Sequence, residues 1–168
     1  RKDLLICLQN NLMPTISDIK QCNICNEIGK KYRKIFYVHL KIDTGMSRLG
    51  FEAKNFLKYF ENIISFENIK IDGIYSHLST ADALDASHEN SYANIQRRTF
   101  LKLLANISIN KYPNITIHLA NSAGTLISND FHFDMVRIGL CMYGYTPSQQ
   151  QNNLMLKPAM SLKSKVSF

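Results

Sequence analysis

The stretch VHLKIDTGMSRLGF, residues 38–51, contains a strand pattern that stops abruptly at a turn. Apolar side chains occupy every second position of its first half: Val38, Leu40 and Ile42. This period-two alternation is typical of a β-strand with one buried face. The pair Thr44–Gly45 then predicts a turn. The strand thus carries Lys41, Asp43 and Arg48 to one of its ends, which indicates a polar site on an apolar scaffold.

Strand patterns alternate with helical patterns along the chain. The expected strands span residues 4–8, 35–42, 69–78, 115–120 and 135–143. The expected helices span residues 18–31, 53–64 and 88–107, with a short fourth helix after residues 121–124 that ends near residue 128. Ser17 is expected to cap the first helix. Because strands that alternate with helices pair in parallel through right-handed crossovers, the pattern predicts an α/β fold.

The number of strands limits the architecture. A closed (β/α)8 barrel takes about 250 residues, so five strands in 168 residues do not close one. The alternation alone leaves two possibilities open, an open doubly wound sheet or part of a barrel. Residues 149–153 are predicted to form a polar linker, and residues 156–168 the first strand of a second unit. We therefore expect one domain over residues 1–150 and a crossover into another over residues 151–168.

The composition indicates a folded domain. The chain is 45% hydrophobic and 20% charged, close to the globular average. Its net charge of +7 is scattered, and the only dense basic cluster, residues 30–34, falls at a predicted helix end, so we expect no nucleic-acid partner. No apolar run reaches the roughly 18 residues of a membrane-spanning helix, and we find no secretion signal, so we expect no membrane partner.

The chain has four cysteines, two of them in the C-x-x-C stretch Cys22–Cys25. That spacing occurs in redox pairs and in halves of zinc sites, but no further ligand with suitable spacing lies nearby. On a helix the two thiols share the face of Ile19 and Ile28, so we interpret them as core residues and expect no metal. Reduced cysteines suit a cytoplasmic protein.

Four clusters of polar or glycine residues lie at the ends of expected strands: Lys41, Asp43 and Arg48; His77, Ser79 and Asp82; Asn121 and Ser122; Arg137 and Gly139. The carboxyl ends of parallel strands meet at one edge of an α/β fold, and ligands bind there. Because this edge would carry Arg48 and Arg137, the sequence predicts a pocket for an anion.

Some of these residues allow more than one interpretation. Ser122, which precedes a helix, is expected to be either its N-cap or a phosphate-binding hydroxyl. His77 suits a general base, a ring-stacking partner or a structural hydrogen bond, whereas His118 is interpreted as structural. Lys41 is costly to bury beside another cation, so it requires an anionic partner such as Asp43 or chemical neutralisation.

Five segments, in order, resemble the signature motifs of alanine racemases: VHLKIDTGMSRLGF (38–51), IDGIYSHLSTAD (71–82), HLANSAGTL (118–126), MVRIGLCMYGYTPS (135–148) and LKPAMSLKSKV (156–166). The resemblance implies a (β/α)8 TIM barrel followed by a mostly β domain. This chain would then hold about strands four to eight, all parallel, and the start of the C-terminal β domain. The resemblance also implies a pyridoxal 5'-phosphate cofactor, a homodimer, and interconversion of L-alanine and D-alanine for peptidoglycan precursors in the cytoplasm.

The resemblance further implies cofactor binding by a set of residues at the strand ends: Arg48, His77, Asn121, Ser122, Arg137, Gly139 and Leu140. In the family, the arginine that matches Arg137 hydrogen-bonds the pyridine nitrogen of the cofactor. The serine that matches Ser122 and the backbone that matches Gly139 and Leu140 hold the phosphate, with Asn121 beside them.

Other roles follow from the same resemblance. Arg48 would bind the phenolic oxygen of the cofactor and seat the substrate carboxylate. His77 would pack near the ring and support the catalytic tyrosine of the partner subunit. Lys41 aligns with a lysine that is carbamylated in many family members, which would turn its repulsion of Arg48 into attraction. Asp82 aligns with an acidic residue that lines the substrate entrance.

The two catalytic bases of the family have no counterpart within this chain. The Schiff-base lysine would precede Arg1 and the opposing tyrosine would follow Phe168. Because racemisation needs two opposed bases, we expect the chain alone to be inactive and to bind pyridoxal phosphate weakly. Two alternatives stay open: another barrel-type pyridoxal-phosphate racemase or binding protein, which the Arg48 and Arg137 motifs disfavour, and a non-catalytic remnant or interaction module.

Overall fold

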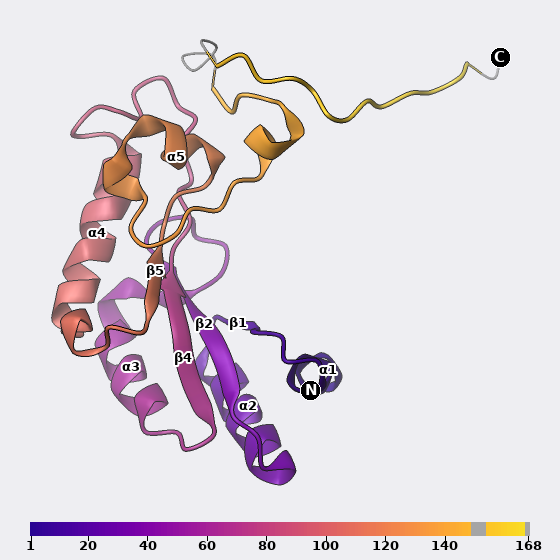
Figure 1. Ribbon diagram of the computed structural model, residues 1–168. Coiled ribbons are helices and arrows are strands. Elements are labelled where there is room, and N and C mark those ends of the chain that lie inside the picture. Colours follow the sequence, from indigo (N-terminus) through magenta and orange to yellow (C-terminus); the bar gives the residue numbers. More distant parts are fainter. Residues whose placement is uncertain (149–153, 167–168) are drawn as a thin grey trace.

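Parallel strands form the centre of the molecule, in the order β1–β2–β4–β5, with β3 paired to the end of β2 (Figure 1). The computed structural model describes residues 1–148 and 154–166. The strands are β1 (Thr15–Ile16), β2 (Phe36–Asp43), β3 (Phe51–Glu52), β4 (Ile69–Tyr75) and β5 (Thr116–His118). The α-helices are α1 (Lys2–Gln9), α2 (Ile19–Tyr32), α3 (Phe56–Ile64), α4 (Tyr92–Asn106) and α5 (Ser122–Ile127). Short 3-10 turns are η1 (Ala53–Asn55), η2 (Ile109–Lys111), η3 (Asn129–Phe131) and η4 (Leu140–Tyr143). The predicted α/β fold with parallel strands is confirmed.

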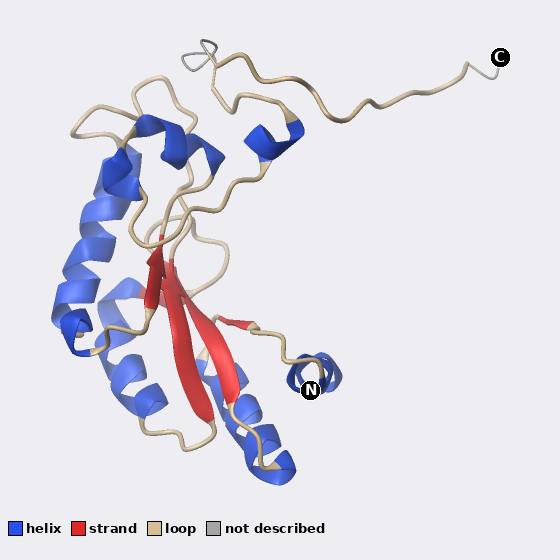
Figure 2. Ribbon diagram, in the orientation of Figure 1, coloured by secondary structure: helices blue, strands red, loops and turns tan. Residues whose placement is uncertain are grey.

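One face of the sheet is covered by helices and the other is open. Figure 2 shows α2, α3 and α4 on the same side of the strands. The side chains of β2 that point to these helices are at most 1% exposed: Phe36, Val38, Leu40 and Ile42. On the opposite face exposure falls along the strand, from 46% at Tyr37 to 6% at Lys41. The alternation in the sequence therefore corresponds to a core side and an open side of one strand.

Residues 4–8, predicted to be a strand, lie in helix α1, so this prediction is wrong. A run as short as LLICL fits either period. In the structure Leu4, Cys7 and Leu8 pack against the core at the i, i+3, i+4 spacing of a helix face, whereas Ile6 is 44% exposed. The first strand is instead β1, where Thr15 pairs with His39 of β2.

The predicted strand over residues 135–143 is also wrong for most of its length. The chain runs beside β5 only at the start, where Met135 forms an isolated bridge with His118 and Arg137 N donates to Ala120 O at 3.0 Å. The chain then turns into η4. Leu140 and Met142 are 47% and 69% exposed, so the apolar pattern here does not reflect burial in a sheet.

Helix starts differ from the prediction by a residue or more. Asp18, not Ser17, caps α2, because its Oδ1 accepts from Gln21 N at 2.8 Å. The helix predicted over residues 53–64 begins as the 3-10 turn η1, and the one predicted from residue 88 begins at Tyr92 behind the cap residue Ser91. Side-chain caps thus mark the observed starts of α2 and α4, whereas α3 begins without one.

The C-terminal segment passes η4, where Ala159 N donates to Tyr143 O at 3.0 Å, and then runs away from the sheet (Figure 1). No strand forms over residues 154–166, so the prediction of a strand there is wrong for the described part. The predicted linker 149–153 lies outside the described residues. The domain boundary near residue 150 stays a prediction.

The thiols of the C-x-x-C stretch lie in the core, as predicted. Cys22 and Cys25 are both 0% exposed. Burial raises the pKa of each thiol to about 12, so both are protonated and unreactive at neutral pH. Across the described ranges, no helix combines the length and the apolar character that crossing a bilayer requires.

Candidate functional site

A cavity of about 370 Å³ opens at the carboxyl edge of the sheet. Most of the residues that the sequence predicted for the site line it: His77, Ser79, Asp82, Asn121, Ser122, Arg137, Gly139 and Leu140. They come from the ends of β4 and β5 and from the segment after them. Larger hollows of about 590 and 940 Å³ lie at the amino ends of the strands, but their walls are mainly apolar. The polar chemistry is therefore concentrated at the carboxyl edge.

The guanidinium of Arg137 donates hydrogen bonds to several acceptors at the strand ends. Its Nη1 donates to His118 Nδ1 at 2.6 Å. Its Nη2 donates to Ser76 O at 2.8 Å and to Leu119 O at 3.2 Å, and lies 3.4 Å from His77 Nδ1. A guanidinium has five N–H groups, so these contacts leave Nε and one Nη1 hydrogen to bind another molecule. Burial lowers the pKa of Arg137, and Tyr75 opposes this shift.

The site is electropositive. Burial and then the charge of Arg48 lower the pKa of Lys41, with Arg137 acting in the same direction. Burial and then the charge of Arg137 lower the pKa of His77, and Lys41 and Arg48 contribute. No ion pair joins Lys41 to a carboxylate among the residues that the structure describes. Clustered cations of this kind favour an anionic ligand.

Asp43, which the sequence suggested as a partner for Lys41, instead shapes the turn that follows β2. Its Oδ1 accepts from Gly45 N at 2.9 Å and from Ser47 N at 3.0 Å. Asp43 still raises the pKa of Lys41, against the larger effects of burial and Arg48. Its carboxylate is thus committed to the backbone of the loop that carries Arg48.

Ser122 is not the N-cap of α5, because Asn121 Oδ1 takes that role by accepting from Gly124 N at 2.9 Å. The Ser122 hydroxyl oxygen accepts from Gly139 N at 2.9 Å and from Cys141 N at 3.4 Å. Its own hydrogen remains available to donate. A Cβ added at Gly139 would meet only Ser122 Oγ, at 3.9 Å, so the backbone there borders open space.

The sequence and the fold are both similar to those of known proteins. A family model described as the N-terminal domain of alanine racemase matches residues 1–147.

This chain belongs to the alanine racemase family.

An alanine racemase of Prochlorococcus marinus is 40% identical over 168 residues, which is 99% of this chain and 43% of that protein. One from Synechocystis is 35% identical and aligns with 93% of this chain. The structure of alanine racemase from Clostridium difficile 630 matches 94% of this chain and 41% of that chain, with a TM-score of 0.84 and 26% identity. The enzyme of Bartonella henselae with covalently bound pyridoxal phosphate matches 91% of this chain and 42% of that chain, with a TM-score of 0.76 and 29% identity. This chain therefore spans less than half the length of these alanine racemases, and its fold resembles part of their N-terminal barrel domain.

Within the alanine racemase fold, the loop that carries Arg48 is shaped by its backbone. Gly45 and Gly50 have φ values of 133° and 136°, which side-chain-bearing residues rarely adopt. Tyr92 of α4 donates its hydroxyl hydrogen to Gly45 O at 3.0 Å, and a Cβ at Gly45 would collide with this hydroxyl. Arg48 is exposed and reaches neither the cavity wall nor a hydrogen-bond partner among the described residues.

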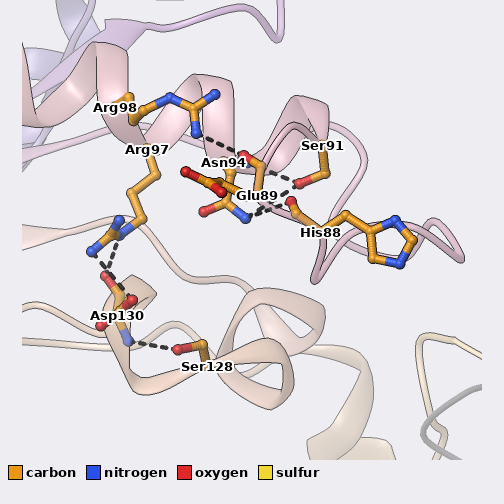
Figure 3. Close-up of polar contacts among 8 residues, drawn as sticks. All are labelled: His88, Glu89, Ser91, Asn94, Arg97, Arg98, Ser128 and Asp130. Atoms are coloured by element: carbon orange, nitrogen blue, oxygen red, sulfur yellow. Dashed lines mark hydrogen bonds and ion pairs between the residues drawn. The ribbon is translucent and has the colours of Figure 1, made fainter.

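The loop between β4 and α4, which contains the exposed residue Asp82, is tied down at the start of α4 (Figure 3). Asn94 Nδ2 donates to His88 O at 2.9 Å, and Arg98 Nη1 donates to Glu89 O at 2.7 Å. In the same view Arg97 Nε donates to Asp130 O at 2.9 Å, which links α4 to η3. These contacts fix the end of the loop against α4, and Asp82, nearer the start of the loop, lines the cavity.

Sequence reasoning missed two residues that build the site. Gln96 of α4 is 0% exposed, and its Oε1 accepts from Ser79 N at 2.9 Å while its Nε2 donates to His77 O at 3.0 Å. Its only signal in the sequence is a single polar residue within an apolar helix face. His118, interpreted as structural, contacts Arg137 directly. Nothing local in the sequence identified Arg137 as the partner of His118.

Proposed function

We propose that this chain forms the cofactor-holding part of an alanine racemase that binds pyridoxal 5'-phosphate and interconverts L-alanine and D-alanine. The observation that carries the proposal is the arrangement around Arg137. Its guanidinium is fixed by His118 and by backbone carbonyls of the strand ends, with free N–H groups beside a cavity that also contains Ser122. Membership of the alanine racemase family supports the assignment.

The described residues fit the cofactor at both of its ends. We assign the phosphate to the Ser122 hydroxyl and to the backbone of the turn at Gly139 and Leu140, with Asn121 alongside. Because the Gly139 N–H donates to Ser122 Oγ, the N–H of Leu140 is the backbone donor that this assignment uses. Hydroxyl and backbone N–H groups are common phosphate ligands. We assign the pyridine nitrogen to Arg137. The positive potential around Lys41 and Arg48 suits the negative charge of the phosphate and of a substrate carboxylate.

When bound, pyridoxal phosphate withdraws electrons from the α-carbon of an amino acid and makes its proton acidic. Arg137 limits this effect, because arginine keeps its proton and offers the ring nitrogen a hydrogen bond instead of a proton. His77 packs beside the cavity and stays neutral, since burial and Arg137 lower its pKa. In the proposed enzyme it supports the catalytic tyrosine of the partner subunit.

Lys41 and Arg48 form the substrate side of the proposed site. We assign to Arg48 the phenolic oxygen of the cofactor and the substrate carboxylate, which requires its exposed side chain to turn toward the cavity that it does not line in this structure. Because burial and Arg48 lower the pKa of Lys41, more of its amine is neutral, which is the form that reacts with carbon dioxide to give a carbamate. The carbamate is anionic and attracts Arg48, so carbamylation replaces a repulsion with an ion pair. Asp82 lines the entrance of the cavity.

The whole enzyme, as we propose it, is a cytoplasmic homodimer that supplies D-alanine for cell-wall precursors. The relatives named alanine racemase support the racemase activity in this proposal. The alternatives, another barrel-type pyridoxal-phosphate racemase or binding protein and a non-catalytic remnant or interaction module, have no comparable support.

The proposal is tested by titrating the chain with pyridoxal phosphate and following ligand absorbance. Arg137→Met removes the donor to the ring nitrogen, so we expect the dissociation constant to rise about tenfold or more, the scale of one lost charged hydrogen bond. His88→Met, in an exposed loop, is the control and leaves the affinity unchanged. Equal affinities for the two variants would contradict the assignment of Arg137.

Activity gives an independent check. The chain holds Arg48 and Arg137 but neither of the two bases that the family uses, so we expect no conversion of L-alanine to D-alanine by residues 1–168 alone. Chiral chromatography of a long incubation with added pyridoxal phosphate measures this directly. Conversion above the level of free cofactor would show that another residue of this chain serves as a base.

A further inference from the structure

A line of polar side chains runs from Arg137 along the open face of the sheet, away from the cavity. Arg137 Nη1 lies 2.6 Å from His118 Nδ1, and His118 Nε2 lies 3.0 Å from His39 Nδ1. The far side of His39 meets a carboxylate, with Nε2 at 3.6 Å from Asp72 Oδ2. The line thus crosses three strands, from β5 through β2 to β4. Neither His39 nor Asp72 lines the cavity.

The donor-only chemistry of arginine sets the direction of every contact in this line. Arg137 has no acceptor, so His118 Nδ1 must present a lone pair to it. Burial and Arg137 lower the pKa of His118 to about 3, so the imidazole is neutral and its single proton is on Nε2. That N–H points at His39 Nδ1, which must therefore be an acceptor. The proton of neutral His39 is then on Nε2, on the side of Asp72.

We propose that His39 and Asp72 are positioning residues that reinforce the His118 tautomer that Arg137 requires and thereby hold Arg137 in its orientation. At 3.6 Å the contact between His39 and Asp72 is too long for a hydrogen bond, so Asp72 acts through its charge, which favours a proton on the facing nitrogen. The consequence for cofactor binding rests on the function proposed above. The tautomers themselves do not depend on it.

The sheet is shaped to admit the ring of His39, which supports the proposal independently. A Cβ added at Gly73, its partner on β4, would lie 2.5 Å from His39 Nδ1, so only glycine leaves room for the imidazole. The register between β2 and β4 shifts at this point, with Val38 opposite Ile71 and His39 opposite Gly73. Asp72 is the extra residue of this bulge. Bulges are a common way of redirecting a side chain.

The ring of His118 is fixed as well. It stacks on Tyr75, with ring centroids 4.6 Å apart and an angle of 8° between the planes. The hydroxyl of Tyr75 lies 3.1 Å from Thr15 Oγ1 of β1. The sheet therefore holds both imidazole rings in place. What can still vary is which nitrogen of each ring carries the proton.

Nitrogen-15 spectra of the histidine rings measure those positions near neutral pH without cofactor. We expect His39 and His118 to be neutral with the proton on Nε2 in each. His132 is an internal reference, because its Nε2 lies 2.9 Å from the Thr125 carbonyl oxygen, away from this line. A proton on Nδ1 of either His39 or His118, or a doubly protonated ring, would overturn the proposal.

Substitutions separate the proposed role from simple packing. His39→Leu removes the acceptor, so the His118 tautomer should become mixed and the affinity for pyridoxal phosphate should fall about three- to tenfold, the scale of one weakened hydrogen bond. His39→Asn retains an acceptor near the position of Nδ1 and should restore both. Asp72→Asn should mix the tautomers of His39 while the fold is retained. The matched controls in the exposed loop are His88→Leu and Asp85→Asn.

The outcomes also separate this proposal from the proposed function. If the tautomers respond as expected but the affinity for pyridoxal phosphate does not, the role in cofactor binding fails and the positioning of His118 stands. If His39→Leu and His39→Asn give the same His118 spectrum, or if both spectra equal that of the unsubstituted chain, the positioning role itself is wrong. Unfolded variants are recognised by loss of the His132 reference signal.

Discussion

On the helix side of β2, Phe36, Val38, Leu40 and Ile42 are at most 1% exposed, whereas Tyr37 on the open side is 46% exposed. The open side also carries His39, which contacts His118 and through it Arg137. Lys41, on the same side, contributes to the positive potential of the site. One strand therefore supplies core packing from one face and polar chemistry from the other. Because successive side chains of a strand alternate between faces, a shift of one residue would exchange the two.

The largest effect is expected from a change on the helix side. Leu40→Ala leaves a cavity in the core and should lower the free energy of unfolding by about 2–5 kcal/mol. Tyr37→Ala, three residues earlier on the open face, should lower it by less than about 1 kcal/mol. Urea unfolding of both variants measures the contrast. Similar losses for the two would mean that the open face is covered and the comparison between the faces is wrong.

A change on the open side should alter the pH dependence of stability. His118 has a pKa of about 3 in the fold against 6.5 unperturbed. Since its folded pKa is lowered, the unfolded chain takes up the proton first as the pH falls below 6.5. Stability from neutral His118 is thus complete above that pH and is lost progressively down to about pH 3.

His118→Asn keeps an acceptor for Arg137 but does not titrate. We expect it to remove roughly 2–4 kcal/mol of the acid-induced loss in unfolding free energy. Unfolding curves of the variant and the unsubstituted chain across this pH range give the difference, in which the titration of shared carboxylates cancels. Parallel pH profiles would show that His118 is charged in the fold or solvated.

The smallest effect concerns the helices that cover the core side. Asp18→Ala removes the cap of α2 and should lower the free energy of unfolding by about 1 kcal/mol. Ser17→Ala serves as the neighbouring control, because it keeps the backbone hydrogen bond from Ser17 N to Gln21 Oε1 at 3.0 Å and loses only the longer contact from Ser17 Oγ at 3.4 Å. A larger loss of unfolding free energy for Ser17→Ala than for Asp18→Ala would show that Ser17, as the sequence suggested, is the cap of α2.

The sequence predicted long, regularly patterned elements well and short ones poorly. The strand over residues 35–42 and the helix over residues 18–31 appear as β2 and α2 within a residue or so. The run over residues 4–8 became a helix, and most of residues 135–143 became an irregular segment. A short apolar run satisfies either period, and only its tertiary neighbours decide between them.

In the candidate site too, local sequence patterns predicted some features and long-range contacts decided the others. Local motifs placed the polar residues at strand ends, and the parallel topology gathered most of them around one cavity. The role of Asn121 as a cap in place of Ser122 depends on a contact three residues away, whereas the link from Arg137 to His118 spans 19 residues and that from His118 to His39 spans 79. Contacts of the second kind leave no periodicity for sequence reasoning to detect.

The sequence by itself determined the parallel α/β class, the buried face of β2, the core position of Cys22 and Cys25, and the strand ends at which charge gathers. These features follow from alternation, helix periodicity and turn residues, which are local properties of the chain. Only the tertiary structure decided that Gln96 ties α4 to the site, that Gly73 makes room for His39, and that Arg137 faces His118. Each of these depends on which strands and helices become neighbours, and that is set by packing across the whole fold.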